Sequence, residues 1–337
     1  MKYFYLVLVF GLAGLLSACV GTGGDSTGYS GSFNNDKYAK VDVDMTLVRI
    51  SRNSWFVQGK AGTAIENAGF ISNAGFVVTP DGIVVFDALG TPSLAAKLLA
   101  RIRSISSAPI KAVVMSHYHA DHLYGLQVFK EQGARVYAPR GAQDYLNSDV
   151  ADNLLAARRK LLAPWVNETT QLVVPDVYVE KDMELKFGGV TLQITPLGKA
   201  HSEGDLAMMV KPDNVLFSGD IIFEGRIPFI GEANTRNWMK TLDSLRGTKV
   251  AALVPGHGPL AKNPDKVIES TYHYLAKLRK HMQVAVDSGD LFGEVYDKID
   301  WGELVFLPAF SEANRRNAYN VYLSIENEML MDDPGPS

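Results

Sequence analysis

From about residue 44 onward, apolar and polar residues follow patterns that predict short strands, tight turns and helices in succession. "MTLVRISRNSWFVQG" alternates weakly and predicts two strands joined by a polar turn. "GFVVTPDGIVVFDA" predicts a hairpin, because the turn residues 79–82 separate two β-branched runs. "TPSLAAKLLARIRSI" then has helical spacing, with Thr91 as the expected N-cap and Pro92 at the first helical position.

The same alternation of element types continues along the chain. "KAVVMSH" predicts a buried strand, "LYGLQVFKEQG" an amphipathic helix that ends at Gly133, and "ARVYAP" another strand. Residues 140–163 are helical in character. A second strand-rich stretch follows in "VTLQITPL", "DLAMMVKPDNVLFSGD" and "KVAALVPGH", with a helix at about 235–247. From about 262 to 289 the pattern is helical again, and helix signals recur near the C-terminus.

Strand-rich segments with interspersed helices therefore occur twice, before and after residues 140–163, and no short-period repeat relates them. This arrangement predicts two β-sheets packed face to face with helices on the outer faces, an α+β fold of the αββα sandwich type. We expect the sandwich to occupy residues 44–262 and a helical extension to occupy residues 263–337.

The N-terminal segment has a different character. Lys2, an apolar run and small residues form the pattern of an export signal, which we assign to residues 1–18. "LSAC" resembles the lipobox of bacterial lipoproteins, which implies cleavage before Cys19 and a lipid on its thiol. Residues 19–43, rich in Gly and Ser, would then tether the protein to a membrane on the periplasmic side. An ordinary secretory signal and an uncleaved anchor are the alternatives.

Composition narrows the class of protein. Apolar residues make up 47% of the 337 residues and charged residues 21%, which is typical of a soluble globular chain. The net charge of −4 and the absence of a basic run argue against nucleic acid as a partner. The chain has one cysteine, so it cannot form an internal disulfide.

The motif "SHYHADHLYG" (residues 116–125) concentrates scarce histidines. His117, His119, Asp121 and His122 fall within six positions of a chain that has seven histidines. Two histidines two residues apart at a strand end point to the same side. Imidazole and carboxylate groups are donors that Zn²⁺ prefers, and they also suit iron or manganese. The cluster therefore indicates a metal site rather than a merely solvated loop.

Three further residues occupy comparable places. His201 follows "VTLQITPL", Asp220 ends "NVLFSGD" and His257 follows "VAALV". Each lies at the C-terminal end of an apolar strand, as the first cluster does, and strand ends hold ligands on a stiff but accessible scaffold. Each residue alone is weak evidence, but together they predict one site. His273 and His281, on a predicted helix without further donors, are expected at the surface.

The order His-x-His-x-Asp-His, a distant His, Asp in "SGD" and then "GHG" resembles the metallo-β-lactamase superfamily over roughly residues 45–260. The resemblance implies the αββα fold and a two-metal site. Carried over residue by residue, it assigns one ion to His117, His119 and His201, the other to Asp121, His122 and His257, and a bridging role to Asp220.

Such a pair of ions makes hydrolysis possible. Two divalent ions about 3.5–4 Å apart lower the pKa of a shared water from about 15.7 toward about 7. The bridging hydroxide would attack an ester, thioester, lactone or amide-type small-molecule substrate, with Asp121 orienting it or taking a proton. We expect two Zn²⁺ ions per chain, with iron or manganese as alternatives. Asp205 is a candidate acceptor for a ligand imidazole, or else a turn cap.

Position 220 bears on the branch of the superfamily. Many zinc β-lactamases have cysteine at the matching place, whereas Asp220 resembles glyoxalase II and the broad hydrolase branch. "GDIIFEGRIPFIGEANTRNWMKTLDSL" resembles quinoprotein relay system zinc metallohydrolases and sulfur-oxidation-associated hydrolases, which are periplasmic. Arg226 and Lys199 are candidates to bind a substrate carboxylate, with surface ion pairs as the alternative. "NLLAARRKLLAPW" forms either a lid or a packing helix.

The leading hypothesis is thus an exported, lipid-anchored, dizinc hydrolase. A mononuclear iron oxygenase acting on sulfur compounds is an alternative, since some relatives on this fold use one iron. A β-lactamase and a non-catalytic metal-binding lipoprotein are further alternatives. The complete set of seven donors favours two metals, and Asp121 argues against a storage site.

Overall fold

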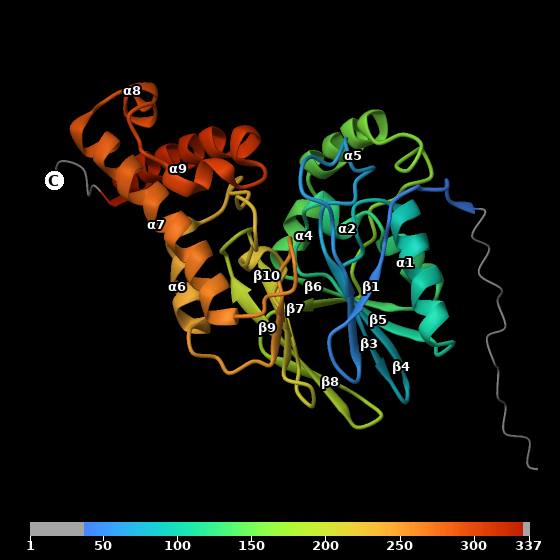
Figure 1. Cartoon of the computed structure of the whole chain (residues 1–337). Coiled ribbons are helices and arrows are strands. Elements are labelled where there is room, and N and C mark those ends of the chain that lie inside the picture. The colour runs from blue at the N-terminus through green and yellow to red at the C-terminus, as the bar shows by residue number, and fades with distance from the viewer. Residues whose placement is uncertain (1–36, 333–337) are drawn as a thin grey trace, which may run out of the picture. The chain divides into compact units, whose positions relative to one another are not determined.

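Two β-sheets face each other in the computed structural model, which describes residues 37–332, and helices cover their outer faces (Figure 1). The predicted αββα sandwich is confirmed. Residues 1–18, Cys19 and most of the expected tether lie outside the described residues. No helix within residues 37–332 is long and apolar enough to cross a membrane.

The first sheet has seven strands arranged in chain order. Its first four strands are antiparallel, and from β4 onward neighbouring strands are parallel, so helices must connect them. The strands are β1 Leu47–Arg49, β2 Ser54–Val57, β3 Ala74–Thr79, β4 Gly82–Phe86, β5 Ile110–Val114, β6 Arg135–Pro139 and β7 Val177–Val179. The predicted hairpin is present as β3 and β4, closed by the pair Thr79 and Gly82.

The second sheet has the strand order β12-β11-β10-β9-β8 and is antiparallel except for the pair β11 and β12. Its strands are β8 Met183–Phe187, β9 Val190–Gly198, β10 Asp205–Val210, β11 Val215–Phe217 and β12 Ala252–Val254. Sequence patterns did not predict β7 and β8. Each forms an edge of its sheet and carries partly exposed or charged residues, so neither has the apolar run of a central strand.

Helices connect the parallel strands and cover both sheets. They are α1 Pro92–Ile105, α2 Ala120–Leu123, α3 Leu126–Glu131, α4 Gly141–Leu146, α5 Asp149–Leu161, η2 Gly219–Ile221, α6 Thr235–Leu245, α7 Pro264–Ser288, α8 Phe292–Tyr296, η3 Gly302–Phe306 and α9 Phe310–Asp332. Helix α1 lies on the side of the first sheet, whereas α6 and α7 lie on the side of the second, with α9 against α7 (Figure 1).

Local sequence explains how α1 begins and why the next helix is broken. The Thr91 Oγ1 accepts a hydrogen bond from the Leu94 N–H at 3.0 Å, as predicted for the N-cap. The single helix expected over residues 123–133 is wrong, because the chain forms α2 and α3 with a break at Gly125. A Cβ at Gly125 would lie 1.9 Å from the Ala88 carbonyl oxygen, so this close approach of backbones requires glycine.

Two hydrophobic clusters stabilise the described residues. One lies between the sheets and includes Phe56, Val114 and Phe217. The other joins the second sheet to α6, α7 and α9 and includes Trp238 and Ile325. The helices after residue 263 therefore share a core with the second sheet, and the domain boundary placed there stays a prediction.

Candidate metal centre

The seven predicted ligand residues meet at one edge of the sandwich. His117 and His119 follow β5, and Asp121 and His122 lie in the short helix α2. These four come from the first sheet. The other three come from the second sheet and lie after β9, in η2 and after β12: His201, Asp220 and His257.

Three overlapping groups of donor atoms form at this edge. Within each group, the three donor atoms lie within 4.8 Å of one another. The groups are His117, His119 and His201; His117, His122 and Asp220; and Asp121, His122 and His257. Each group combines residues of both sheets, so the cluster crosses the interface between them.

The first group consists of imidazoles alone. The Nδ1 of His119 lies 3.0 Å from the Nε2 of His117 and 2.9 Å from the Nε2 of His201. His119 therefore presents Nδ1 to the centre, whereas the two rings on either side present Nε2. Three nitrogen atoms that converge in this way form one face of a coordination site.

Asp220 lies between the groups. Its Oδ1 is 3.1 Å from the Nε2 of His122, and its Oδ2 is 3.2 Å from the Nε2 of His257 and 3.4 Å from the Nε2 of His201. The Asp121 Oδ2 is 3.2 Å from the same nitrogen of His257. A single carboxylate thus faces imidazoles of both proposed ligand sets, which is the position required of a bridging ligand.

Asp87, at the end of β4, sets the orientation of two rings. Its carboxylate accepts hydrogen bonds from the Ser116 N–H (2.7 Å), the Ser116 hydroxyl (2.8 Å) and the His122 Nδ1 (2.9 Å). Because the Ser116 hydroxyl donates to Asp87, its oxygen accepts from the His117 Nδ1 at 2.9 Å. The Nδ1 of both rings is therefore protonated, and the Nε2 of each ring faces the centre, where a bound cation would take its lone pair.

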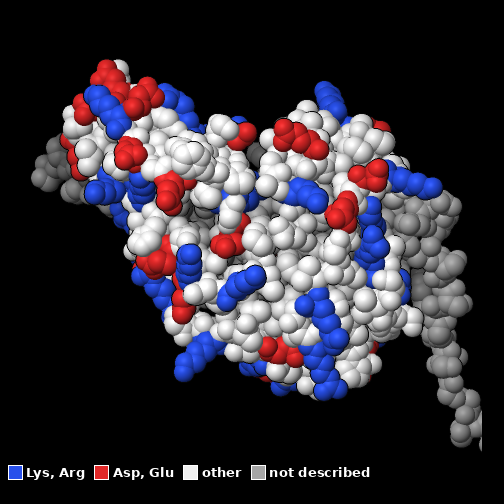
Figure 2. Space-filling model, in the orientation of Figure 1, with Lys and Arg blue, Asp and Glu red and all other residues white. Residues whose placement is uncertain are grey.

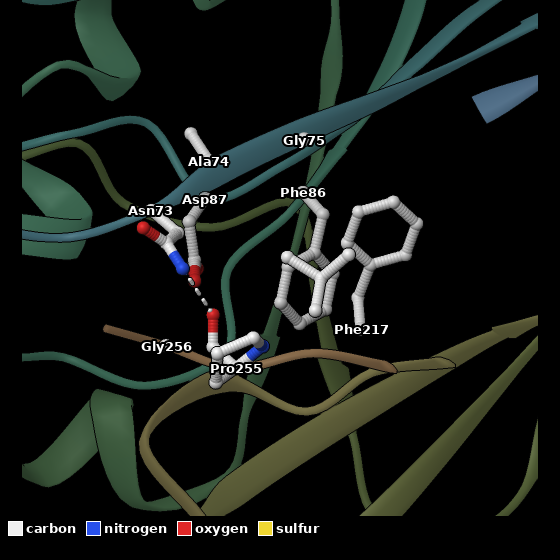
Figure 3. A pocket seen from close by; sticks show the side chains of 9 residues that line it. Asn73, Ala74, Gly75, Phe86, Asp87, Phe217, Pro255 and Gly256 are labelled. Carbon is white, nitrogen blue, oxygen red and sulfur yellow. Dashed lines mark hydrogen bonds between the residues drawn. The ribbon is translucent and has the colours of Figure 1, made fainter. Parts of the chain in front are cut away.

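The His257 ring is fixed from the other sheet. Its Nδ1 donates to the Ile71 carbonyl at 2.7 Å. Asn73 holds the loop that carries His257, because its amide donates to the Pro255 and Gly258 carbonyls at 2.8 and 2.9 Å. Figure 3 shows Asn73 beside Asp87, Pro255 and Gly256 at a small pocket.

Burial keeps the first group neutral. It lowers the pKa of His201 to about 3 and lowers the pKa of His117 and His119 as well, because a charged imidazole would lose its hydration. The neutral ring is the form that binds a metal ion.

The two imidazoles beside Asp121 and Asp220, those of His122 and His257, shift in the other direction. Burial opposes protonation of His122 and His257, but the carboxylates of Asp220 and Asp121 outweigh it and raise the pKa of both rings. Burial raises the pKa of Asp121 and Asp220. The two imidazoles beside them lower it by more, so the pKa of each carboxyl group is lowered overall. The carboxylates are therefore ionised at neutral pH and can act as anionic ligands.

These residues fit a divalent cation. The His122 Nε2 and the Asp220 Oδ1 are buried 3.1 Å apart, and with a neutral ring neither has a hydrogen-bond donor among residues 37–332, so a bound cation would satisfy both lone pairs. Neutral imidazoles and ionised carboxylates that converge from several sides are the donors of zinc, iron and manganese sites. The arrangement can therefore hold metal ions and activate water beside them.

The other candidate residues lie in different settings. Arg226 is half-buried, and its Nη1 lies 3.4 Å from the His257 Nδ1, close to the cluster. Lys199 is exposed and its ammonium pairs with Glu203, so its substrate-binding role stays a prediction. Asp205 accepts from the Ser202 N–H at 3.0 Å and from the Ala200 N–H, which shapes the loop that carries His201. It caps a turn and contacts no ligand imidazole.

The predicted surface histidines are indeed peripheral: His273 pairs with Glu269 at 2.7 Å on α7, and His281 is partly exposed. Sequence reasoning missed Asp87, Ser116 and Asn73. Asp87 and Ser116 follow strands β4 and β5, so the rule that placed the ligands at strand ends could have found them.

Comparisons with known proteins agree with this geometry. A family model described as "Metallo-beta-lactamase superfamily" matches residues 67–257. Metallo-beta-lactamase IND-1 of Chryseobacterium indologenes is 23% identical over 193 residues, which are 56% of this chain and 72% of that protein. Linear primary-alkylsulfatase of Pseudomonas sp. is 24% identical over 226 residues, but the match spans 57% of this chain and 42% of that protein.

Among solved structures, the stereoselective inverting sec-alkylsulfatase Pisa1 from Pseudomonas sp. is similar with a TM-score of 0.66 and 20% identity. The similarity covers 87% of this chain and 52% of that one. At this identity the likeness shows a shared fold.

Proposed function

Because this chain belongs to the metallo-beta-lactamase superfamily, we propose that it is a hydrolase whose seven clustered side chains hold two zinc ions. The observation that carries the proposal is the position of Asp220 between two sets of imidazoles. One ion would be held by His117, His119 and His201, the other by Asp121, His122 and His257, and Asp220 would contact both.

The ions would supply Lewis acidity, which makes water a nucleophile near neutral pH and polarises the group under attack. Asp121 supports the chemistry from the protein side. Its side chain is 20% exposed, whereas that of His122 beside it is fully buried, so Asp121 borders the space open to solvent. We assign to Asp121 the orientation of the attacking water or the acceptance of its proton. The Ser72 hydroxyl fixes this residue by donating to its backbone carbonyl at 2.5 Å.

The proposed substrate is a small molecule with an ester, thioester, lactone or amide-type bond. We expect this substrate to carry an anionic group that binds Arg226. The Arg226 guanidinium is half-buried near His257, and its Nε has no hydrogen-bond partner within the described residues. A bidentate contact with a carboxylate would satisfy it. The resemblance to quinoprotein relay and sulfur-oxidation-associated hydrolases stays a prediction.

A sulfate ester is a second candidate substrate. The sec-alkylsulfatase structure covers 87% of this chain, a share that extends beyond the family match at residues 67–257. Part of the chain outside the family match is therefore also similar to a protein named for alkyl sulfate hydrolysis, which supports including sulfate esters as substrates.

We also propose that the protein is exported and lipid-anchored on the periplasmic side. The support is the order of Lys2, an apolar run and "LSAC", which places the one cysteine of the chain at the end of the signal pattern. Residues 19–43 would then tether the hydrolase at the membrane surface.

A hydrolase panel run beside elemental analysis tests the proposal. The panel contains thioesters, lactones, β-lactams, phosphodiesters and alkyl sulfates, assayed with the wild type and Asp121→Asn. We expect two zinc ions per chain and turnover of at least one ester-type substrate, and a loss of turnover in the variant greater than its loss of metal. One iron per chain with oxygen consumption would instead support the iron oxygenase.

A further inference from the structure

Arg158 of α5 lines the same pocket as one residue of the proposed site. It lines a small, partly open pocket with Asp121, Ala120, Gly90 and Ile71. Asp121 and Arg158 are the two ionisable side chains of this pocket, and their charged atoms are not in ion-pair contact. A gap bounded by a cation on one side and by a residue of the metal cluster on the other suits a ligand that touches both.

The guanidinium of Arg158 has no assigned structural role. Within residues 37–332 it forms no ion pair and no hydrogen bond, although the residue is half-buried. The next residue on the helix differs: Arg159 donates to the Asn167 carbonyl at 3.0 Å and to the Thr170 carbonyl at 2.9 Å. Of these two neighbouring arginines, one stabilises a loop and the other presents its donors to the pocket.

Arg158 and Asp121 line this pocket together, and the remaining lining residues are apolar or glycine: Ala64, Gly69, Ile71, Gly90, Ala120 and Leu162. The guanidinium is therefore the one cationic group among the residues that line the pocket. Figure 2 shows the surface hollowed between the α5 side and the C-terminal helices, with charges of both signs scattered over this face. This face of the molecule therefore carries no broad basic patch.

We infer that Arg158 is a specificity-determining residue that binds an anionic oxygen group of the substrate, a carboxylate or a sulfate, beside Asp121. The inference rests on the proposed function and narrows its substrate class to anionic esters. The planar guanidinium donates in parallel to two oxygens of such a group, which fixes the position of the adjacent bond at the metal cluster. A neutral ester would enter the same pocket without this contact.

Ligand binding to the zinc-supplemented full chain tests the inference independently of turnover. Calorimetry compares hexanesulfonate, hexanoate and the neutral hexanol with the wild type, Arg158→Gln and Arg158→Lys. Lys160→Gln is the matched control, because Lys160 is exposed on the same helix and its loss changes the net charge equally. We expect Arg158→Gln to weaken binding of at least one anion about 10- to 100-fold, the range of a charge-assisted hydrogen bond. Arg158→Lys should lose part of this affinity, while Lys160→Gln and hexanol should show no change.

Two outcomes overturn the inference: equal anion binding by the wild type and Arg158→Gln, or equal weakening by Lys160→Gln. Arg158→Lys keeps the charge and the packing of the aliphatic part of the side chain. If Arg158→Gln fails to fold, the anion affinity of Arg158→Lys decides whether the inference holds. Weakening restricted to hexanesulfonate assigns the pocket to sulfate, and weakening restricted to hexanoate assigns it to carboxylate.

Steady-state kinetics with two esters separates this inference from the proposed function. It compares the neutral 4-nitrophenyl acetate with the anionic mono-4-nitrophenyl glutarate. Arg158→Gln should raise KM for the anionic ester by a factor similar to its loss of anion affinity. It should leave KM for the neutral ester unchanged. Anion binding that depends on Arg158 in a protein without any hydrolase activity would contradict the proposed function and leave the inference intact.

Discussion

Asp87 and His122, 35 residues apart, are joined by a hydrogen bond of 2.9 Å between a strand-end carboxylate and the Nδ1 of a buried ring. Asp87 has a φ of +62°, a left-handed conformation that aspartate tolerates better than most residues. This conformation brings its carboxylate to three donors at once. Asp87 thereby determines which nitrogen of His122 faces the cluster.

Replacing Asp87 should therefore weaken metal binding without removing a ligand. An asparagine cannot accept from three donors, so Asp87→Asn should lose about 10- to 100-fold in zinc affinity. Competition with a chromogenic chelator measures the affinity. Asp42→Asn, an exposed change in the same charge, is the control. Unchanged zinc affinity in Asp87→Asn would mean that Asp87 does not position the ligand rings.

The two ligand sets should be separable by mutation. His257→Ala removes a donor from the third group and leaves His117, His119 and His201 intact. We expect elemental analysis to find about one zinc ion per chain in this variant and two in the wild type. His273→Ala, which changes an exposed histidine of α7, should keep both ions. Equal metal content in His257→Ala and the wild type would contradict the assignment of His257.

Asp205 predicts a pH dependence of stability. Burial raises its pKa to about 7, although hydrogen bonds from Ser202 and Ala200 oppose the shift. The native state of the metal-free protein then binds more protons than the unfolded state between about pH 4 and 7. The contribution of Asp205 to stability is thus fully present below its unfolded pKa and is lost as pH rises through about 7.

Asp205→Asn should remove this dependence, because the amide keeps the shape and one acceptor oxygen. Urea unfolding of chelator-treated protein at several pH values measures the effect. The free energy of unfolding of the wild type should fall relative to that of the variant as pH rises from 4 to 7, by roughly 4 kcal/mol or less. Parallel pH profiles would show that Asp205 ionises normally.

Asn73 should matter for stability as well as for the site. Besides its two donated bonds, its side-chain oxygen accepts from the Gly59 N–H at 3.0 Å, and the residue is buried. Asn73→Ala leaves three backbone groups without their partner and should lower the free energy of unfolding by about 2–4 kcal/mol. Denaturant titration measures it, with the exposed Asn153→Ala as the control. A loss below about 0.5 kcal/mol, the range of surface substitutions, would contradict this role.

The lipid anchor gives a prediction at Cys19. Expression of the full chain in a bacterial host should place the wild type in the membrane fraction and Cys19→Ser in a non-membrane fraction. Mass spectrometry of the N-terminal peptide should find a modified Cys19 as the first residue. An unmodified peptide that retains residues 1–18 would instead indicate an uncleaved anchor.

Sequence patterns predict the ligand cluster well because both of its signals are local. The histidine motif stands out by density, and each remote ligand directly follows an apolar strand. Asp87 obeys the same strand-end rule, but a single aspartate in "VVFDA" carries no chemical signal of its own. Its role depends on the neighbouring strand β5, which brings Ser116 within reach.

Other features depend on tertiary packing and are beyond such patterns. The break at Gly125 results from contact with Ala88, which is remote in sequence. The edge strands β7 and β8 take their pairing from longer neighbours. Likewise, the amphipathic pattern of α5 does not distinguish Arg158 from Arg159, because the surroundings of each side chain depend on how the helix packs against the rest of the protein.

Because each proposed ligand set takes two donors from the first sheet and one from the second, a bound ion would act as a clasp across the sandwich. Pulling the two layers apart would require breaking coordination bonds, so metal release and separation of the layers become one event. By mass action, the free energy of unfolding then rises with the concentration of free metal. The increase is about 2.7 kcal/mol when the metal concentration is one hundred times the dissociation constant. Depletion of metal would therefore lower the stability of the folded protein as well as its activity.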